Sequence, residues 1–396
     1  MIKVLRIINR FNLGGPTYNA AYLTKYLSSE YTTLLVGGVP EKHETDSLHI
    51  VKSLNIEQVI IPEMSRSINP LNDVISYRKI KQLIKEFKPD IVHTHASKAG
   101  LLGRIAAIQE KVPVIVHTFH GHVFHSYFNP LITRLFIGIE RYLANKSSAI
   151  VAISELQKRE LTEQFRVVSN QKCVVIPLGL DLKRFSENKE EKRIKFRKQY
   201  NIPEDVVVIG IVGRLVPIKN HRLILDAFRI LKSRTNKRLE ILIVGDGETK
   251  NELIQYTKEL GLKFRTCSED MSADVYFTSW IKEMDEAYSG MDIVALCSKN
   301  EGTPVSLLEA QASGKMIVTT NVGGVKDIVH SEAGYIVDDF SVESFADALE
   351  KAVAEYEERN RRIEEKVSPQ IIQQYSYEIL VNRMDALYKN LMGLVV

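Results

Sequence analysis

The sequence predicts an α/β protein built from two doubly wound parallel-sheet domains. Along most of the chain, short apolar runs alternate with longer amphipathic stretches, which is the pattern of βα units on a parallel sheet. A run of Glu, Lys and Arg from Glu187 to Gln199 interrupts that rhythm, which then restarts. At 396 residues the chain is also long for one compact core. Two domains of roughly 200 residues each are therefore expected.

In the first half, apolar runs predict strands at Val4–Ile8, Thr33–Val36, Val59–Ile61, Ile91–His93, Val114–His117, Ala149–Ile153 and Cys173–Ile176. Amphipathic stretches between them predict helices at Tyr18–Leu27, Val74–Phe87, Ala99–Gln109 and Glu155–Gln164. The helix from Tyr18 follows Gly14-Gly15-Pro16-Thr17, so a glycine-rich turn is expected to open into a helix N-terminus.

In the second half, strands are predicted at Val206–Val212, Leu239–Val244, Val275–Phe277, Ile293–Leu296, Met316–Thr319 and Tyr335–Val337. Helices are predicted at Arg222–Leu231, Thr249–Leu260, Lys282–Ser289, Val305–Ser313, Val325–Val329 and Val342–Tyr356, with one long amphipathic helix over Ile372–Met392. The charged run is interpreted as the interdomain connection plus a solvated first helix. The expected domains are therefore 1–186 and 187–371, followed by a C-terminal helix within 372–396.

Composition narrows the class of protein. Hydrophobic residues make up 44% and charged residues 26% of the chain, which is typical of a globular protein. Cys173, Cys267 and Cys297 form no CxxC pair, so neither a disulfide framework nor a zinc site is expected. A net charge of +4 is too small and dispersed to indicate a nucleic-acid partner. No signal peptide or spanning segment is predicted, and a cytoplasmic protein is expected.

The segment Glu301–Glu309 carries the most chemical information. Thr303 is predicted as an N-cap with Pro304 at the first helical position, so that the N–H groups of Val305 and Ser306 are free to bind an anion. Carboxylates would repel a diphosphate bound there, so Glu301 and Glu309 are expected to contact neutral hydroxyls on either side of it. Either Glu taken alone is more simply a surface residue; the combination with Gly302 carries the argument.

Two further segments of the second half join this candidate site. Gly213-Arg214 and Lys219-Asn220 follow a predicted strand, and Arg214 and Lys219 can neutralise a diphosphate leaving group. A solvated loop is an equally good interpretation of those two cations alone. The segment Asn321–Asp327 contains a Gly-Gly turn that suits a close backbone approach, although it can equally be a structural turn.

In the first half, Gly14-Gly15 is expected to reach phosphates, and His120 follows a strand at a position suited to contact a sugar. His122 and His125 are interpreted as structural, and His93 and His95 as buttresses of the site. The segment Val123–Phe128 with Leu131, Leu135 and Phe136 is a candidate acceptor-binding or membrane-facing loop; a buried loop and helix is the favoured alternative.

Together these segments resemble the family-4 retaining glycosyltransferases, which have the GT-B fold of two Rossmann-like domains facing a cleft. The resemblance rests on Glu301–Glu309, on Gly213–Asn220 and on Gly14-Gly15, with support from His120-Gly121, Pro177–Asp181 and Gly245–Glu248. The stretch Asp90–Arg104 also resembles the capsular-polysaccharide and exopolysaccharide branch. Ser279, Met316 and Asp327 depart from the residues common in the family, and the stretch Phe264–Ala273 is longer than usual.

The resemblance implies a role for each matching residue. Glu301 would contact the donor sugar and Glu309 the ribose, while His120 would lie beside the transferred sugar. Arg214 and Lys219 would hold the diphosphate, helped by the amides of Val305 and Ser306, and Gly15 would approach the phosphates. The nucleobase would lie near Ser279 and Trp280. The other donor-binding residues would be Gly213, Gly302, Thr303 and Pro304. The C-terminal helix would pack back on the first domain. No metal or other cofactor is implied, and the sequence contains no Asp-x-Asp motif.

The expected activity is that of a glycosyltransferase, a hexosyltransferase in which the acceptor attacks on the face that the diphosphate leaves. The donor would be a UDP-sugar, such as a UDP-N-acetylhexosamine, and the acceptor a lipid-linked or growing glycan in bacterial capsule or other cell-surface polysaccharide synthesis. Peripheral contact with an anionic membrane, at the inner face of the plasma membrane, would fit that role; the oligomeric state stays open. The alternatives are a UDP-sugar 2-epimerase on the same fold and a non-catalytic nucleotide-sugar-binding partner in a polysaccharide-synthesis complex. No Gly-x-Gly-x-x-Gly follows the first strand, so a nicotinamide enzyme is poorly supported.

Overall fold

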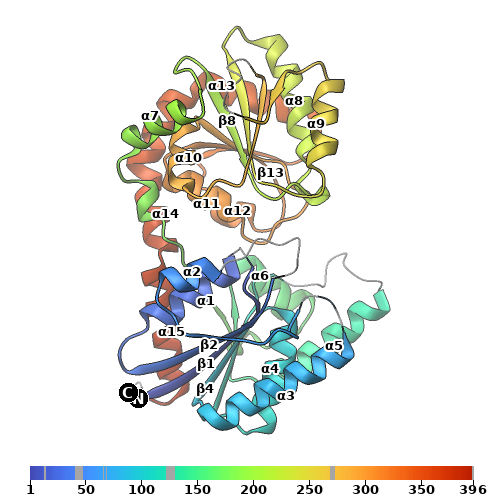
Figure 1. The fold of residues 1–396 in the computed structure, drawn as a ribbon, viewed down its shortest axis with the longest axis vertical. Coiled ribbons are helices and arrows are strands. Elements are labelled where there is room, and N and C mark those ends of the chain that lie inside the picture. The colour runs from blue at the N-terminus through green and yellow to red at the C-terminus, as the bar shows by residue number, and fades with distance from the viewer. Residues whose placement is uncertain are drawn as a thin grey trace. The chain divides into compact units, whose positions relative to one another are not determined.

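The computed structural model describes residues 1–12, 15–40, 48–65, 67, 69–121, 130–267 and 273–394. Its contacts divide the chain into two compact units, shown in Figure 1. Unit 1 contains Met1–Leu180 and Tyr375–Val396, and unit 2 contains Asp181–Gln374. The chain therefore passes from unit 1 into unit 2 and returns to unit 1 for its last helix.

Unit 1 contains a parallel sheet of seven strands in the order β3-β2-β1-β4-β5-β6-β7. The strands are β1 Ile2–Arg10, β2 Tyr31–Gly38, β3 Gln58–Ile60, β4 Ile91–His95, β5 Val114–Thr118, β6 Ala149–Ala152 and β7 Cys173–Val175. The helices are α1 Gly15–Tyr26, α2 Leu48–Ser53, α3 Pro70–Phe87, α4 Ser97–Gln109, α5 Pro130–Lys146 and α6 Glu155–Arg159, the last continued by a π turn over Glu160–Gln164. Every strand predicted in this half is present, whereas α2 and α5 were not predicted.

The C-terminal helix completes a core on one face of this sheet. Helix α15 (Tyr377–Leu391) contributes Leu380, Met384 and Tyr388 to a cluster with Val4 and Ile91 of the central strands. The predicted single helix over Ile372–Met392 is wrong, because the chain breaks at Ser376 between α14 (Ser368–Tyr375) and α15. Ser376 has an extended backbone, and its hydroxyl accepts the N–H of Ile379 as the N-cap of α15.

Unit 2 contains a second parallel sheet of seven strands, in the order β10-β11-β9-β8-β12-β13-β14. The strands are β8 Val207–Val212, β9 Leu239–Val244, β10 Phe264–Arg265, β11 Val275–Ser279, β12 Ile293–Leu296, β13 Met316–Thr320 and β14 Gly334–Val337. The helices are α7 Lys189–Gln199, α8 His221–Arg234, α9 Lys250–Glu259, α10 Met284–Gly290, α11 Val305–Ala312, α12 Val325–Ile328 and α13 Val342–Arg362; a π turn over Ile363–Val367 joins α13 to α14. Only the two-residue strand β10 was not predicted.

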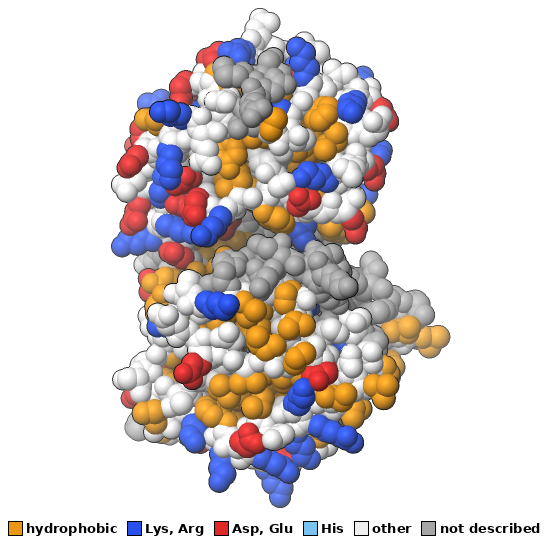
Figure 2. Space-filling view, viewed as in Figure 1, with side chains coloured by type: hydrophobic (Ala, Val, Ile, Leu, Met, Phe, Trp, Pro, Cys, Tyr) orange, Lys and Arg blue, Asp and Glu red, His pale blue; other side chains and the backbone are white. Residues whose placement is uncertain are grey.

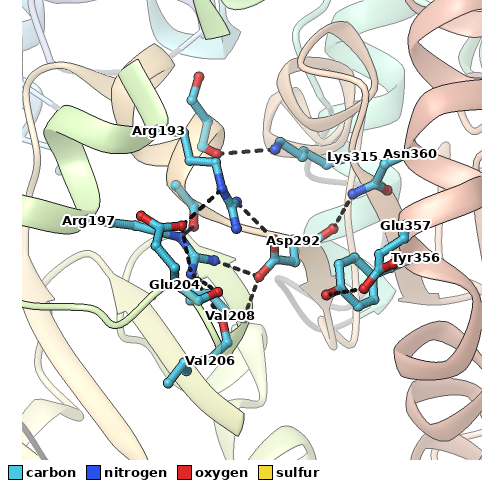
Figure 3. A network of polar contacts seen from close by, with 12 residues as sticks. Arg193, Arg197, Glu204, Val206, Val208, Asp292, Lys315, Tyr356, Glu357 and Asn360 are labelled. Carbon is cyan, nitrogen blue, oxygen red and sulfur yellow. Dashed lines mark hydrogen bonds and ion pairs between the residues drawn. The ribbon is translucent and has the colours of Figure 1, made fainter. Parts of the chain in front are cut away.

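Helix α7 is tied to the amino ends of β8 and β12 by the buried network in Figure 3. The carboxylate of Asp292 accepts hydrogen bonds from Arg193 (2.9 Å), Arg197 (2.7 Å) and the N–H of Val208 (2.8 Å). Lys315 donates to the carbonyl of Ser289, and burial lowers its pKa to about 8. The predicted first helix of this unit is present as α7, but it is not wholly solvated, since it buries Phe196 and Arg197.

Among the helices that the structure describes, none is long and apolar enough to cross a membrane.

Candidate active site

The loops that leave the carboxyl ends of the second sheet pack directly on one another. The carbonyl oxygen of Gly213 would lie only 1.9 Å from a Cβ added to Gly245, whose φ is +147°. The N–H of Gly213 donates to Val244 (3.0 Å), and that of Gly245 donates to Ser279 (3.0 Å). The loops after β8, β9 and β11 therefore form one continuous edge, and any larger residue at Gly245 would separate them.

A partly buried ion pair lies on this edge between the loops after β8 and β12. The ammonium of Lys219 is 2.5 Å from a carboxylate oxygen of Glu301, whose side chain is only 12% exposed. The hydroxyl of Ser298 donates to the same oxygen (2.6 Å). Arg214 is exposed and has no ion pair or side-chain hydrogen bond with the part of the chain that the structure describes. One cation is thus held in place by Glu301, and a second is free to meet an anion.

Helix α11 begins beside this ion pair with an open N-terminus. The predicted cap is wrong by one residue: Pro304 is the N-cap, with φ −71° and ψ 103°, and no side chain caps the helix. The buried hydroxyl oxygen of Thr303 has no hydrogen-bond partner in the described structure. Val305 is the first helical residue, as predicted. The N–H groups of Val305 and Ser306 therefore have no partner within the helix and can bind an anion.

The Gly-Gly turn Gly323-Gly324 packs against the backbone of Glu301 and Gly302. The N–H of Gly324 donates to the carbonyl of Gly302 (3.0 Å). A Cβ at Gly323, where φ is +51°, would lie 1.7 Å from the carbonyl oxygen of Glu301. The turn thus approaches the Glu301 segment of the chain itself, which is the structural-turn alternative, and an approach to a ligand stays a prediction.

Glu309 lies one turn into α11, half-buried against Tyr288 of α10. The Tyr288 hydroxyl donates to the carbonyl of Ser306 (3.0 Å) and also hydrogen bonds to the Glu309 carboxyl. Burial raises the pKa of Glu309 to about 7, and the Tyr288 hydrogen bond and the charge of Arg184 only partly offset it. Glu309 can therefore change its charge near neutral pH.

Ser279 and Trp280 end β11 at the far side of the same edge. Ser279 has φ +61°, a left-handed conformation that glycine adopts without strain. The glycine common in the family at this position therefore has a structural reason. Lys250 donates to the Ser279 hydroxyl (2.5 Å) and to Asp246 (3.0 Å), which fixes the strained residue, while the Trp280 side chain is 39% exposed.

The remaining predicted site residues lie in unit 1. Gly15 is the first residue of α1, and His120 follows β5. The Nε2 of His120 lies 2.9 Å from Nδ1 of His95, so these two histidines lie together as part of one cluster. Gly14, His122, His125 and the segment Val123–Phe128 lie outside the described residues. Leu131 and Leu135 are not in a loop; they lie exposed on α5.

Some residues of the site could not be singled out from the sequence. Tyr288 and Arg184 face Glu309 from other elements, and no motif or spacing marks either of them. Ser298 was detectable in principle, because it follows a predicted strand three positions before Glu301. Asp246 lies in the Gly245–Glu248 segment, which gave only weak support to the family resemblance. Among the described residues, no group of three His, Cys, Asp or Glu side chains is arranged to hold a metal ion.

Several solved structures are similar to the whole of this chain. A glycosyltransferase from Rickettsia africae superimposes with a TM-score of 0.78 at 20% identity, covering 99% of this chain and 98% of its own. HepE from Anabaena, solved in complex with UDP, gives 0.79 at 17% identity and covers 98% and 100%. The fold is therefore GT-B, with two parallel-sheet units.

Sequence comparisons place the chain within a family. The family model described as Glycosyltransferase Family 4 matches residues 13–184, and the one described as Glycosyl transferases group 1 matches residues 192–367. An Escherichia coli UDP-Gal:alpha-D-GlcNAc-diphosphoundecaprenol alpha-1,3-galactosyltransferase is 30% identical over 298 residues, 74% of each chain. The Staphylococcus aureus capsular polysaccharide biosynthesis glycosyltransferase CapM is 28% identical over 327 residues, 79% of this chain and 82% of its own. The chain belongs to the family-4 glycosyltransferases and is an enzyme of sugar transfer.

Proposed function

We propose that the enzyme transfers a sugar from a UDP-sugar to a lipid-linked or growing glycan in bacterial cell-surface polysaccharide synthesis, with retention of anomeric configuration. The observation that carries the proposal is the Lys219–Glu301 ion pair beside the open N-terminus of α11. That arrangement offers a diphosphate two kinds of donor, and it offers sugar hydroxyls a carboxylate that is already oriented.

The charge balance of the site favours a diphosphate leaving group. Arg214 supplies a positive charge with no described partner, and Lys219 is held at the same edge by Glu301. The first-turn amides of α11 add the positive end of the helix dipole. Together these groups can stabilise the negative charge that develops on the diphosphate as the glycosidic bond breaks, without rearranging first.

The proposed chemistry is a same-face substitution. The acceptor hydroxyl attacks the anomeric carbon beside the departing diphosphate, and a diphosphate oxygen takes the hydroxyl proton. One bond from carbon to the acceptor oxygen forms while the bond to the diphosphate oxygen breaks, so the configuration is retained. Glu301 contacts hydroxyls of the transferred sugar in this scheme, since repulsion keeps its carboxylate away from the phosphates.

A lipid-linked acceptor agrees with the exposed surface of unit 1. Figure 2 shows hydrophobic side chains gathered where Figure 1 draws α3, α4 and α5. The exposed residues on α3 and α5 are Leu71, Val74, Ile75, Leu131, Ile132, Leu135 and Tyr142. Exposed Arg134, Arg141 and Lys146 on α5 add positive charge for an anionic lipid surface. The Escherichia coli relative acts, by its name, on a diphosphoundecaprenol glycan.

The proposed function is tested by donor binding followed by product analysis. UDP-sugars are expected to raise the melting temperature of the protein more than the matching GDP-sugars, because binding to the native state adds to its free energy of unfolding. The preferred donor is then incubated with lipid-linked glycans, and the anomeric configuration of the product is read by NMR. An inverted product would contradict the mechanism. Release of a free epimerised sugar without acceptor would instead support an epimerase.

Donor affinity is expected to depend on pH through Glu309. A carboxylate accepts hydrogen bonds from both ribose hydroxyls, so donor binding should favour the ionised form and lower the pKa from about 7. Below that pKa a proton must be released on binding, and the dissociation constant should rise about tenfold for each pH unit. Above it, the affinity should be constant. Calorimetric titration with a UDP-sugar, whose diphosphate does not titrate in this range, measures the slope.

The matched control for this titration is Glu309→Gln, which cannot ionise. Its donor affinity is expected to be weaker and independent of pH over the same range. An equal pH dependence in both proteins would show that another group titrates, and the ribose role of Glu309 would then be rejected.

A further inference from the structure

An open groove runs between helices α4 and α5 of unit 1, which Figure 1 draws side by side. Its walls are apolar, with two side chains from α4 and three from α5: Leu101, Ile105, Leu135, Ile139 and Tyr142. The groove has a volume of about 600 Å³, which is the size of a small-molecule site. It is therefore large enough to hold part of a hydrocarbon chain.

Gly138 keeps this groove open. It lies in the middle of α5, where glycine is less stable than alanine, and its helical backbone does not require glycine. A Cβ added at Gly138 would have no other atom within 4 Å. The two helices are fixed to each other by a buried ion pair between Arg104 and Glu140 (2.6 Å). Neither the backbone nor the packing therefore requires glycine at position 138, and its missing side chain leaves the groove unfilled.

Among the described residues that line the groove, only Arg134 is charged, and it lies toward one end. Helices α4 and α5 each join two neighbouring parallel strands, so both run from the carboxyl edge of the sheet back to its amino edge. Arg134 lies one turn into α5, and Tyr142 lies about 12 Å further along the helix axis. The exposed cation is thus at the end of the groove nearer the carboxyl edge, where ligands of such sheets bind.

We propose that this groove binds the hydrocarbon chain of a lipid-linked acceptor, with Arg134 paired to the phosphate at the head of that chain. The proposal rests on the proposed function, which supplies a lipid-linked acceptor. Such a molecule has the same polarity as the groove, because a phosphate joins its apolar chain to the glycan that must reach the carboxyl edge. The apolar walls remove the chain from water, and the guanidinium can bind two phosphate oxygens at once. A bilayer contact requires only exposed apolar side chains, whereas the gap at Gly138 suits a single chain.

Farnesyl diphosphate is the probe for this groove, because it carries a diphosphate and a short apolar chain but no sugar. In calorimetric titration of the full chain, Gly138→Leu should fold normally, fill the groove and weaken binding of the probe about 10-fold or more. Asn145→Leu is the matched control, because it adds the same side chain to an exposed position of α5 outside the groove lining. Arg134→Gln should weaken farnesyl diphosphate about 10-fold and leave farnesol binding unchanged. No binding by the wild type, or equal binding by Gly138→Leu, would overturn the proposal.

Co-sedimentation with vesicles of phosphatidylglycerol and phosphatidylethanolamine separates a single bound chain from a bilayer contact. Gly138→Leu adds apolar surface, so its vesicle binding should equal or exceed that of the wild type although its binding of farnesyl diphosphate is weaker. A parallel loss of both would show that the groove is a bilayer contact, and the proposal would be rejected. None of these measurements requires sugar transfer. If the wild-type enzyme transfers no sugar from any UDP-sugar, the proposed function fails, and the titrations still decide whether the groove binds a chain.

Discussion

Replacing Arg214 with Ala is expected to lower kcat about 100-fold to 1000-fold while leaving the melting temperature unchanged. The guanidinium is exposed and has no described partner, so the folded protein loses no interaction when it is removed. The diphosphate gains a further negative charge as it leaves, so the loss should fall on kcat more than on donor affinity. Steady-state kinetics with thermal unfolding of the same preparation measures both effects.

Lys219→Ala should lower kcat by a similar factor, with a cost in stability that Arg214→Ala does not have. It leaves the partly buried Glu301 carboxylate with Ser298 as its one side-chain partner among the described residues, which costs about 1–3 kcal/mol. Arg238→Ala is the matched control, because Arg238 is an exposed cation just before β9, at the opposite edge of the sheet. Near-normal turnover in both site variants would refute the role of these cations as diphosphate-stabilising groups.

Gly323→Ala is expected to cause the largest combined loss of stability and activity. The new Cβ would lie 1.7 Å from the carbonyl oxygen of Glu301, so this segment must move and take the Lys219 ion pair with it. Left-handed strain and overlap together should cost about 2–4 kcal/mol, and the displaced site about 100-fold in kcat/KM. Chemical denaturation and steady-state kinetics measure the two losses.

Gly261→Ala provides the control for backbone strain. Gly261 is also left-handed, with φ +72°, but a Cβ there has open space around it. This variant should lose only about 1–2 kcal/mol and keep its activity. If the two variants lost the same stability and Gly323→Ala stayed active, the proposed role of the Gly323-Gly324 turn in supporting Glu301 would be wrong.

The fold was readable because each buried strand is a short apolar run, as Ile293–Leu296 illustrates. Helix α5 was missed because Leu131, Leu135 and Phe136 were interpreted as part of the candidate loop that begins at Val123. Strand β10 and helix α2 are too short to establish a periodicity. The cap of α11 was displaced because Pro304 keeps an extended backbone, so the helix begins one residue later than the Thr-Pro pair suggests.

The site was predictable where its residues directly follow predicted strands, and hidden where its residues lie in elements that carry no motif. Lys219 and Glu301 could be proposed together because each follows a predicted strand, and such ends meet at one edge of a parallel sheet. The hydrogen bond between His93 and Tyr388 joins residues 295 positions apart, and no local sequence pattern predicts it. The left-handed backbone of Ser279 explains why glycine is common in the family at this position, a reason that the sequence alone does not show.

The last helix has a consequence for the order in which the protein folds. Leu380, Met384, Leu387 and Tyr388 close a core whose other members belong mainly to β1, β4, β5 and β6. A ribosome synthesises the whole of unit 2 before it reaches these residues. While unit 2 is being synthesised, the sheet of unit 1 therefore lacks the helix α15 that covers one of its apolar faces. This discontinuity makes the nascent chain dependent on its final residues for protection against aggregation.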